Sequence, residues 1–117
     1  MAGLTTHVLD TANGVPAVGV RLTLFRIADD ERSVVCSAIT NADGRVDSPL
    51  LTADTASVGV YELCFAAGAY FQARGTPMPD PPFVNEVFLR FGIADAGAHY
   101  HVPLLVSPWS YSTYRGS

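Results

Sequence analysis

The sequence predicts an all-β protein: a two-sheet antiparallel β-sandwich of seven to eight short strands with one short helix. Apolar and polar residues alternate with a period of two through most of the chain, which is typical of strands with one face in a core. Turn-forming residues separate these stretches at short intervals, as they do in β-sandwiches. The 117 residues suffice for one domain, residues 1–117, with a core of its own.

The N-terminal half contains three strand-like stretches. The first is TTHVLD. Between residues 18 and 24, valine and leucine alternate with Arg21 and Thr23, and the β-branched stretch SVVCSAIT follows. The turn signals ADDE and NADG flank that last stretch, and Gly44 of NADG can adopt the positive φ that a tight turn needs.

The C-terminal half continues the pattern and contains the exception to it. The stretches VYELCFA and EVFLRFGI alternate strictly and predict two more strands, and HYHVPLL predicts another. The segment GAYFQARG lacks the alternation and carries good helix formers between two glycines, so it predicts a helix of about two turns. The proline-rich stretch TPMPDPPF predicts a rigid connection to the next strand.

The composition favours an oligomer that does not bind nucleic acid. Hydrophobic residues make up 49% of the chain and charged residues only 15%, so we expect part of the apolar excess to lie in subunit contacts. The formal net charge is −4, with seven arginines and no lysine. A nucleic-acid surface would need a clustered basic patch, which this balance does not provide.

The two cysteines and the chain start indicate a reducing compartment. Cys36 and Cys64 lie in apolar strand-like stretches without zinc-type spacing, and we interpret them as buried free thiols. The start MAGLTTHVLD lacks the basic leader and apolar stretch of a signal peptide, and no segment is long enough to span a membrane. We therefore expect a cytoplasmic protein without a membrane partner.

The three histidines are the first candidates for a functional site. His99 and His101 stand two positions apart in a predicted strand, so their side chains point to the same face. Together with His7 they could supply three ligands of a catalytic zinc site, or they could be ordinary polar surface. No carboxylate or thiol lies at ligand spacing, so we favour a polar site without a metal.

Arg45 is the second candidate. It follows the turn glycine in NADGRVDSPLL, where a strand start can aim its side chain. Its planar guanidinium suits a carboxylate or an oxygen-rich heterocycle. The alternative is a weak surface ion pair with Asp43 or Asp47, worth at most about 1 kcal/mol. The residues themselves do not decide between these.

Several motifs, taken together, resemble one known family. They are LTTHVLDTANGVPA, NADGRVDSPLL, YELCF followed by YF, PPF, and the C-terminal HYHVPLLVSPWSYSTYRGS. In this combination the chain resembles the 5-hydroxyisourate hydrolases, transthyretin-related enzymes of urate (purine) degradation. The resemblance runs from residue 4 to the last residue. The terminal Tyr-Arg-Gly-Ser separates these enzymes from the hormone carrier transthyretin.

The resemblance implies a transthyretin-like sandwich assembled as a homotetramer, a dimer of dimers, with sites in the channel where dimers meet. It assigns catalysis to His7, Arg45 and His101. It assigns substrate binding to His7 and Arg45 as well, together with Tyr114 and Ser117. The implied reaction hydrolyses a ring amide of 5-hydroxyisourate to give 2-oxo-4-hydroxy-4-carboxy-5-ureidoimidazoline, without a metal or organic cofactor.

Three alternatives stay open at the level of the sequence. The first is a non-catalytic carrier of the same fold that holds a small aromatic ligand in its channel. The second is a zinc hydrolase that uses all three histidines, and the role of His99 is undecided. The third is a covalent acyl-enzyme through Ser112, Thr113 or Ser117, although direct attack by water activated by the histidine pair is favoured because no Gly-x-Ser-x-Gly motif is present.

Overall fold

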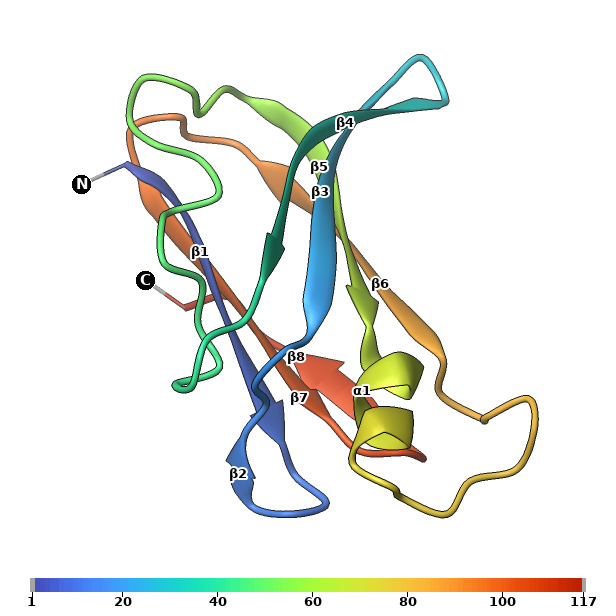
Figure 1. The fold of residues 1–117 in the computed structure, drawn as a ribbon. Helices are drawn as coiled ribbons and strands as arrows, with labels where there is room; N and C mark the ends of the chain where they lie inside the picture. The colour runs from blue at the N-terminus through green and yellow to red at the C-terminus, as the bar shows by residue number, and fades with distance from the viewer. Residues whose placement is uncertain (1, 117) are drawn as a thin grey trace.

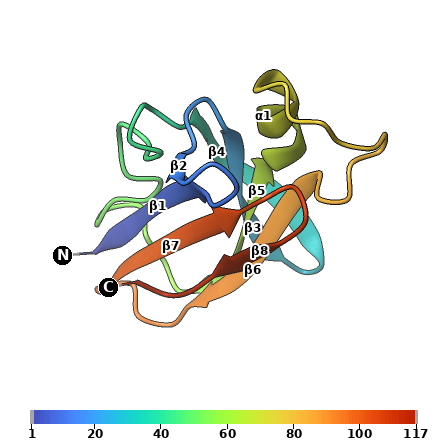
Figure 2. The ribbon, with the colours of Figure 1, turned by 90° about the horizontal axis from the view of Figure 1, so that it is seen from below.

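The computed structural model describes residues 2–116 and consists of two four-stranded sheets packed against each other (Figures 1 and 2). The strand order is β2-β1-β7-β8 in one sheet and β4-β3-β5-β6 in the other. The eight strands and one helix confirm the predicted fold class. Their bounds are β1 (Gly3–Asp10), β2 (Val15–Pro16), β3 (Arg21–Ala28), β4 (Glu31–Ile39), β5 (Gly59–Ala66), α1 (Ala67–Ala73), β6 (Glu86–Ile93), β7 (His99–Val106) and β8 (Tyr111–Thr113).

One strand pair departs from the antiparallel rule. β1 and β7 run parallel, with Gly3 opposite His99 and Asp10 opposite Val106, while the other pairs are antiparallel. Alternation indicates which face a side chain takes but not the direction of the neighbouring strand. The parallel register brings the N-terminal motif and the C-terminal motif side by side.

The core lies between the two sheets and follows the predicted alternation. In β5, Tyr61, Leu63 and Phe65 point inward and are at most 2% exposed. The predicted strand that begins at Val18 starts only at Arg21, because the preceding residues form a turn around Gly19 with φ of +82°. The largest fully buried side chains are Tyr61, Phe65, Phe71, Leu4, Leu22, Leu24, Leu63, Leu104, Val8, Val20, Val87 and Val106.

Both predicted turns are present. Asp29 and Asp30 connect β3 to β4 with φ of +53° and +63°, a conformation that aspartate tolerates better than most residues. Gly44 has φ of +75°, and a Cβ there would collide with the carbonyl oxygen of Val8. The second turn therefore requires glycine for its backbone angle and for its close approach to β1.

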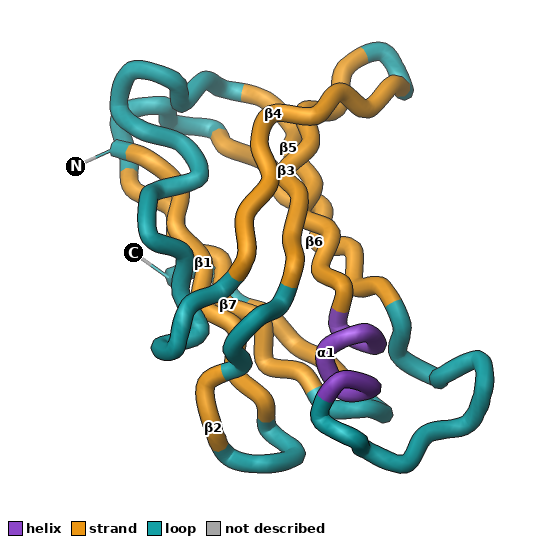
Figure 3. The backbone as a smooth tube through the Cα atoms, viewed as in Figure 1, coloured by secondary structure: helices purple, strands orange, loops and turns teal. Residues whose placement is uncertain are grey.

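The loop between β4 and β5 runs beside β1 (Figure 3). The Val8 amide donates to the Gly44 carbonyl at 2.8 Å, and the Leu4 amide donates to the Leu51 carbonyl at 2.9 Å. On the far side of the β1–β7 pair, the terminal segment pairs with β7 through Gly116 and His101. The loop and the terminal segment thus add backbone hydrogen bonds on both sides of the β1–β7 pair. The candidate residues His7, Arg45 and His101 lie in this region.

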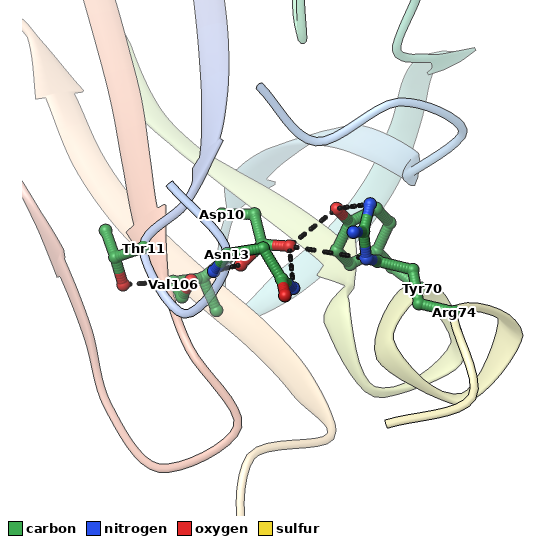
Figure 4. Close-up of polar contacts among 6 residues, drawn as sticks. All are labelled: Asp10, Thr11, Asn13, Tyr70, Arg74 and Val106. Atoms are coloured by element: carbon green, nitrogen blue, oxygen red, sulfur yellow. Dashed lines mark hydrogen bonds and ion pairs between the residues drawn. The ribbon is translucent and has the colours of Figure 1, made fainter. Parts of the chain in front are cut away.

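A buried carboxylate ties helix α1 to the end of β1 (Figure 4). The Tyr70 hydroxyl and the Asn13 side-chain amide each donate to Asp10 Oδ2 at 2.7 Å, and Arg74 Nε lies 3.8 Å from the same oxygen. Burial alone would raise the pKa of the Asp10 carboxyl, but hydrogen bonds from Asn13 and Tyr70 outweigh it and hold the pKa below its usual value. The ionised carboxylate thus anchors the predicted helix to the sheet.

The two cysteines are free, as predicted, but half-buried rather than buried. Burial, followed by a hydrogen bond to Glu86, raises the pKa of the Cys64 thiol to about 11, so it stays protonated. Over residues 2–116, the structure contains no helix with the length and apolar character that a membrane crossing requires.

Candidate active site

The candidate site lies on the outer face of the β2-β1-β7-β8 sheet. In β1 and the first half of β7, even-numbered side chains face the core and odd-numbered ones face outward. Thr5 and His7 of β1 and His99 and His101 of β7 are therefore on the same face, each half-buried. The parallel register puts Thr5 opposite His101, so groups from the two ends of the chain meet.

Arg45 and His7 are held next to each other by the turn after β4. Their backbones form an antiparallel bridge, and the Asn41 side-chain oxygen accepts the amides of Asp43 at 2.9 Å and Arg45 at 3.2 Å. His7 Nε2 lies 2.8 Å from the Asp43 carbonyl oxygen. Because a carbonyl oxygen can only accept, Nε2 carries a proton, and Nδ1 is the nitrogen left bare in the neutral form of the ring.

Within residues 2–116, Arg45 forms no ion pair with Asp43 or Asp47. The Asp47 carboxylate instead accepts a hydrogen bond from the Asn41 side chain at 3.0 Å. This leaves the alternative of a weak surface ion pair without support.

His101 is fixed from two sides. Its Nδ1 lies 2.8 Å from the Thr5 hydroxyl oxygen, and its backbone exchanges two hydrogen bonds with Gly116, of 2.7 and 3.2 Å. A Cβ on Gly116 would lie 3.0 Å from both Cβ and Cδ2 of His101, closer than ordinary packing allows. The glycine of the terminal motif therefore gives room to the imidazole.

The electrostatics of the site favour a neutral His101. Burial lowers the pKa of His101 most, and the electrostatic effects of Arg45, His7 and His99 lower it further. A neutral imidazole can accept a proton at physiological pH. The structure thus brings together His7, Arg45 and His101, three of the five residues that the resemblance indicates.

The other two predicted residues belong to the terminal segment. Tyr114 is 59% exposed and contributes to the lining of a cleft of about 380 Å³ between β6 and the end of the chain. The guanidinium of the next residue, Arg115, stacks on the Tyr100 ring at 4.2 Å and holds this segment against β7. Ser117 lies outside the described residues. No described contact joins Tyr114 to the three clustered residues, so both assignments stay predictions.

Two positioning residues escaped the sequence analysis. Thr5 precedes His7 by two positions, so strand periodicity would have placed it on the same face, but a threonine in a strand carries no catalytic signal of its own. Asn41 opens the NADG turn, where a side chain that bonds its own backbone is common. The sequence does not show that this hydrogen bonding holds Arg45 next to His7, because that depends on how the turn lies beside β1.

Comparison with known proteins places this geometry in a family. The model of the HIUase/transthyretin family matches residues 4–116. The chain belongs to the HIUase/transthyretin family. A relative from Ralstonia nicotianae, described as a 5-hydroxyisourate hydrolase, is 58% identical over 117 residues that cover the whole of both chains. The family prediction from the sequence motifs is confirmed.

Solved structures of the HIUase/transthyretin type share the fold but differ in what they are named for. An (S)-allantoin synthase superimposes with a TM-score of 0.93 at 47% identity over 99% of this chain, which spans only 44% of that longer protein. Transthyretin from Sparus aurata superimposes with a TM-score of 0.87 at 28% identity, over 99% of this chain and 97% of its own. The fold alone therefore does not distinguish an enzyme from a carrier. That distinction depends on the residues of the site.

The geometry also bears on the two alternative chemistries. His99 Nε2 and His101 Nδ1 both face the Thr5 hydroxyl oxygen, at 3.1 and 2.8 Å, rather than a shared position for a metal ion. The Thr113 hydroxyl donates to the Pro103 carbonyl at 2.7 Å, so it is engaged by the backbone. Neither zinc binding nor a threonine nucleophile gains support from these contacts.

Proposed function

We propose that this chain hydrolyses 5-hydroxyisourate to 2-oxo-4-hydroxy-4-carboxy-5-ureidoimidazoline, a step of urate degradation. The observation that carries the proposal is the cluster of His7, Arg45 and His101 on one outer sheet face. It occurs in a chain that is 58% identical, end to end, to a protein described as a 5-hydroxyisourate hydrolase. The reaction needs an activated water, a stabilised oxyanion and a hold on a flat polar ring, and the cluster can supply each.

In the proposed mechanism His101 is the general base. Its Nδ1 is engaged by Thr5, which leaves Nε2 to take a proton from water as the oxygen attacks the ring carbonyl. Proton transfer of this kind contributes roughly 10²–10⁴-fold. The bare Nδ1 of His7 accepts the second hydrogen of the water and orients it. When the ring C–N bond breaks, the proton held at the imidazole passes to the leaving nitrogen.

Arg45 has two roles in this proposal. Its guanidinium stabilises the negative charge that develops on the carbonyl oxygen and donates to oxygen atoms of the substrate. Its charge also lowers the pKa of His101, which keeps the base neutral. Tyr114 and Ser117 would fix the substrate ring by hydrogen bonds. The chemistry requires no metal ion or organic cofactor.

The active assembly is proposed to be a homotetramer, a dimer of dimers, in the cytoplasm. The edge strands β6 and β8 lie on the same side of the sandwich (Figure 2) and can each pair with another strand. Large apolar side chains are also exposed in the single chain, among them Phe88 at 45% and Trp109 at 65%. Two half-buried free thiols fit a reducing compartment.

The rival function is a carrier in the manner of transthyretin. A channel built for an apolar aromatic ligand would be lined mainly by apolar groups. Here the outer face presents the three imidazoles of His7, His99 and His101 with the Arg45 guanidinium beside them, so the polar cluster favours the hydrolase.

The proposal is tested by Arg45→Glu, with Arg21→Glu as the matched control. Arg21 is exposed like Arg45, but it begins β3 and belongs to the other sheet. We expect Arg45→Glu to lower kcat/KM for 5-hydroxyisourate by roughly 10²-fold or more, because an acid replaces the oxyanion donor. Arg21→Glu should match the wild type, and both should keep its oligomeric size. Undiminished activity in Arg45→Glu would remove Arg45 from the mechanism.

A further inference from the structure

The Thr5 hydroxyl lies between two histidines. Its Oγ1 is 3.1 Å from His99 Nε2 and 2.8 Å from His101 Nδ1. The parallel register creates this arrangement, because it puts Thr5 opposite His101 with His99 two positions earlier on the same face of β7. A hydroxyl has one proton to donate and two lone pairs that accept, so it can connect the two imidazoles in series.

We propose that Thr5 and His99 form a proton relay behind His101. His101 Nδ1–H donates to Thr5 Oγ1, and Thr5 Oγ1–H donates to His99 Nε2. This leaves His101 Nε2 without a proton and able to act as the base. The inference rests on the proposed function for its purpose, but the hydrogen-bond pattern itself can be measured without substrate.

The direction of the hydrogen bonds follows from the role of His101 as the base. The ring nitrogen that lies 2.8 Å from the Thr5 hydroxyl is Nδ1, so the other nitrogen, Nε2, has to receive the proton from water. A neutral imidazole with Nδ1–H has a bare Nε2. The opposite tautomer would carry its hydrogen on Nε2 and block the base.

The relay step conserves protons and breaks no other bond. When His101 Nε2 takes a proton from water, the ring becomes a cation. Its Nδ1 proton then passes to Thr5 Oγ1 as the Thr5 proton passes to His99 Nε2. At the end His101 is neutral with a hydrogen on Nε2, Thr5 is again a hydroxyl, and His99 carries the positive charge. Reversal of the same steps returns the proton for the leaving nitrogen.

The reason for the relay is the charge of Arg45. Arg45, His7 and His99 each lower the pKa of His101 electrostatically, and among these three Arg45 has the largest effect. His7 pairs with Arg45 on one side of His101 along the sheet, whereas His99 lies two residues away on the other side. Two strand residues span about 7 Å, so the relay moves the charge that far from Arg45. It therefore reduces repulsion during catalysis.

The first test reads the tautomers directly. ¹⁵N-labelled wild-type protein without substrate is studied by two-bond ¹H–¹⁵N correlation at a pH where both histidines are neutral. We expect His101 as the Nδ1–H tautomer and His99 with a bare Nε2. In Thr5→Val, which removes the hydroxyl at nearly constant shape, this assignment should change for at least one ring. A wild-type His101 with its hydrogen on Nε2 would overturn the relay, whatever the enzyme activity.

The second test is kinetic and separates the relay from mere packing. His99→Gln keeps an amide that can hydrogen bond to Thr5 but cannot carry a proton. We expect Thr5→Val and His99→Gln each to lower kcat by about tenfold with KM little changed, and the double variant to be no slower than either. Thr5→Ser restores the hydroxyl and should recover most of the loss. Thr23→Val, at an outward-facing threonine of the other sheet, is the control.

Other kinetic outcomes have distinct meanings. Wild-type kcat in His99→Gln would overturn the relay while hydrolysis itself stays established. Losses that multiply in the double variant would also overturn it, since independent packing effects add in free energy. Absence of hydrolysis in the wild type would instead contradict the proposed function, and the tautomer measurement would still decide whether the hydrogen-bond chain exists.

Discussion

The Gly44→Ala substitution tests whether the turn after β4 positions Arg45. An alanine at φ of +75° costs about 1–2 kcal/mol in backbone strain. Its Cβ would also collide with the Val8 carbonyl oxygen and lie 3.2 Å from the Pro16 Cβ. Crowding of this kind adds about 1–3 kcal/mol, so the total loss of stability should be about 2–5 kcal/mol.

The activity of Gly44→Ala should also fall, even where the variant is fully folded. The turn has to move away from β1 to relieve the collision, and it carries Arg45 with it, whereas His101 stays on β7. A displacement of about 1 Å at a catalytic group can cost roughly 10²-fold in rate. We therefore expect kcat/KM to drop by about 10–100-fold, measured by the decay of 5-hydroxyisourate absorbance under conditions where the variant is fully folded.

Gly75→Ala is the matched control for this prediction. Gly75, after helix α1, has φ of +79°, but a Cβ there would meet nothing within 4 Å. The control should lose only the backbone term of about 1–2 kcal/mol in urea unfolding and keep its activity. If Gly44→Ala is as active as the wild type, or if both variants lose activity equally, the turn does not position Arg45.

Three further predictions concern the hydrogen bonds to the buried Asp10 carboxylate, the pKa of His101 and the glycine at position 116. Tyr70→Phe should cost about 1.5–3 kcal/mol in urea unfolding at fixed protomer concentration, because it removes a hydrogen bond to an ionised group. The pKa of Asp10 is lowered in the folded protein, so the ionised carboxylate stabilises the fold above the unfolded-state pKa near 3.8. This stabilisation is lost as the pH falls through the folded-state pKa. The loss of unfolding free energy caused by Tyr70→Phe should therefore be smaller in acid. Arg45→Gln should raise the pKa of His101 toward its ordinary value and shift the acid limb of the kcat/KM profile to higher pH. In Gly116→Ala the new Cβ should displace the imidazole and lower kcat, while urea unfolding changes little.

Local patterns in the sequence predicted the elements of this fold well. Period-two alternation in β5 predicted both the strand and its buried face. Side chains two positions apart point to the same side of a strand, so Tyr61, Leu63 and Phe65 are buried together. Asp43-Gly44 marked the turn because few residues adopt its positive φ. The helix after β5 was predicted from the loss of alternation between two glycines.

Long-range arrangement could not be predicted in the same way. Nothing in the alternation of β1 or β7 indicates that they pair in parallel, yet that pairing puts Thr5 beside His101. The meeting of His7 and Arg45 depends on a loop that runs along a strand edge. The motif resemblance indicated these residues from the family, without the contacts that explain them. Thr5 and Asn41 act only through those contacts and so carried no signal.

The measurement that tests the central claim most directly is the ultraviolet absorbance of freshly generated 5-hydroxyisourate. The substrate is made in situ by urate oxidase, and the purified protein is added in the presence of a chelator. The account predicts that the absorbance decays well above its spontaneous rate, through hydrolysis by His7, Arg45 and His101. A folded protein that leaves the spontaneous decay unchanged would contradict it, and ligand binding by a carrier of the same fold would then be examined.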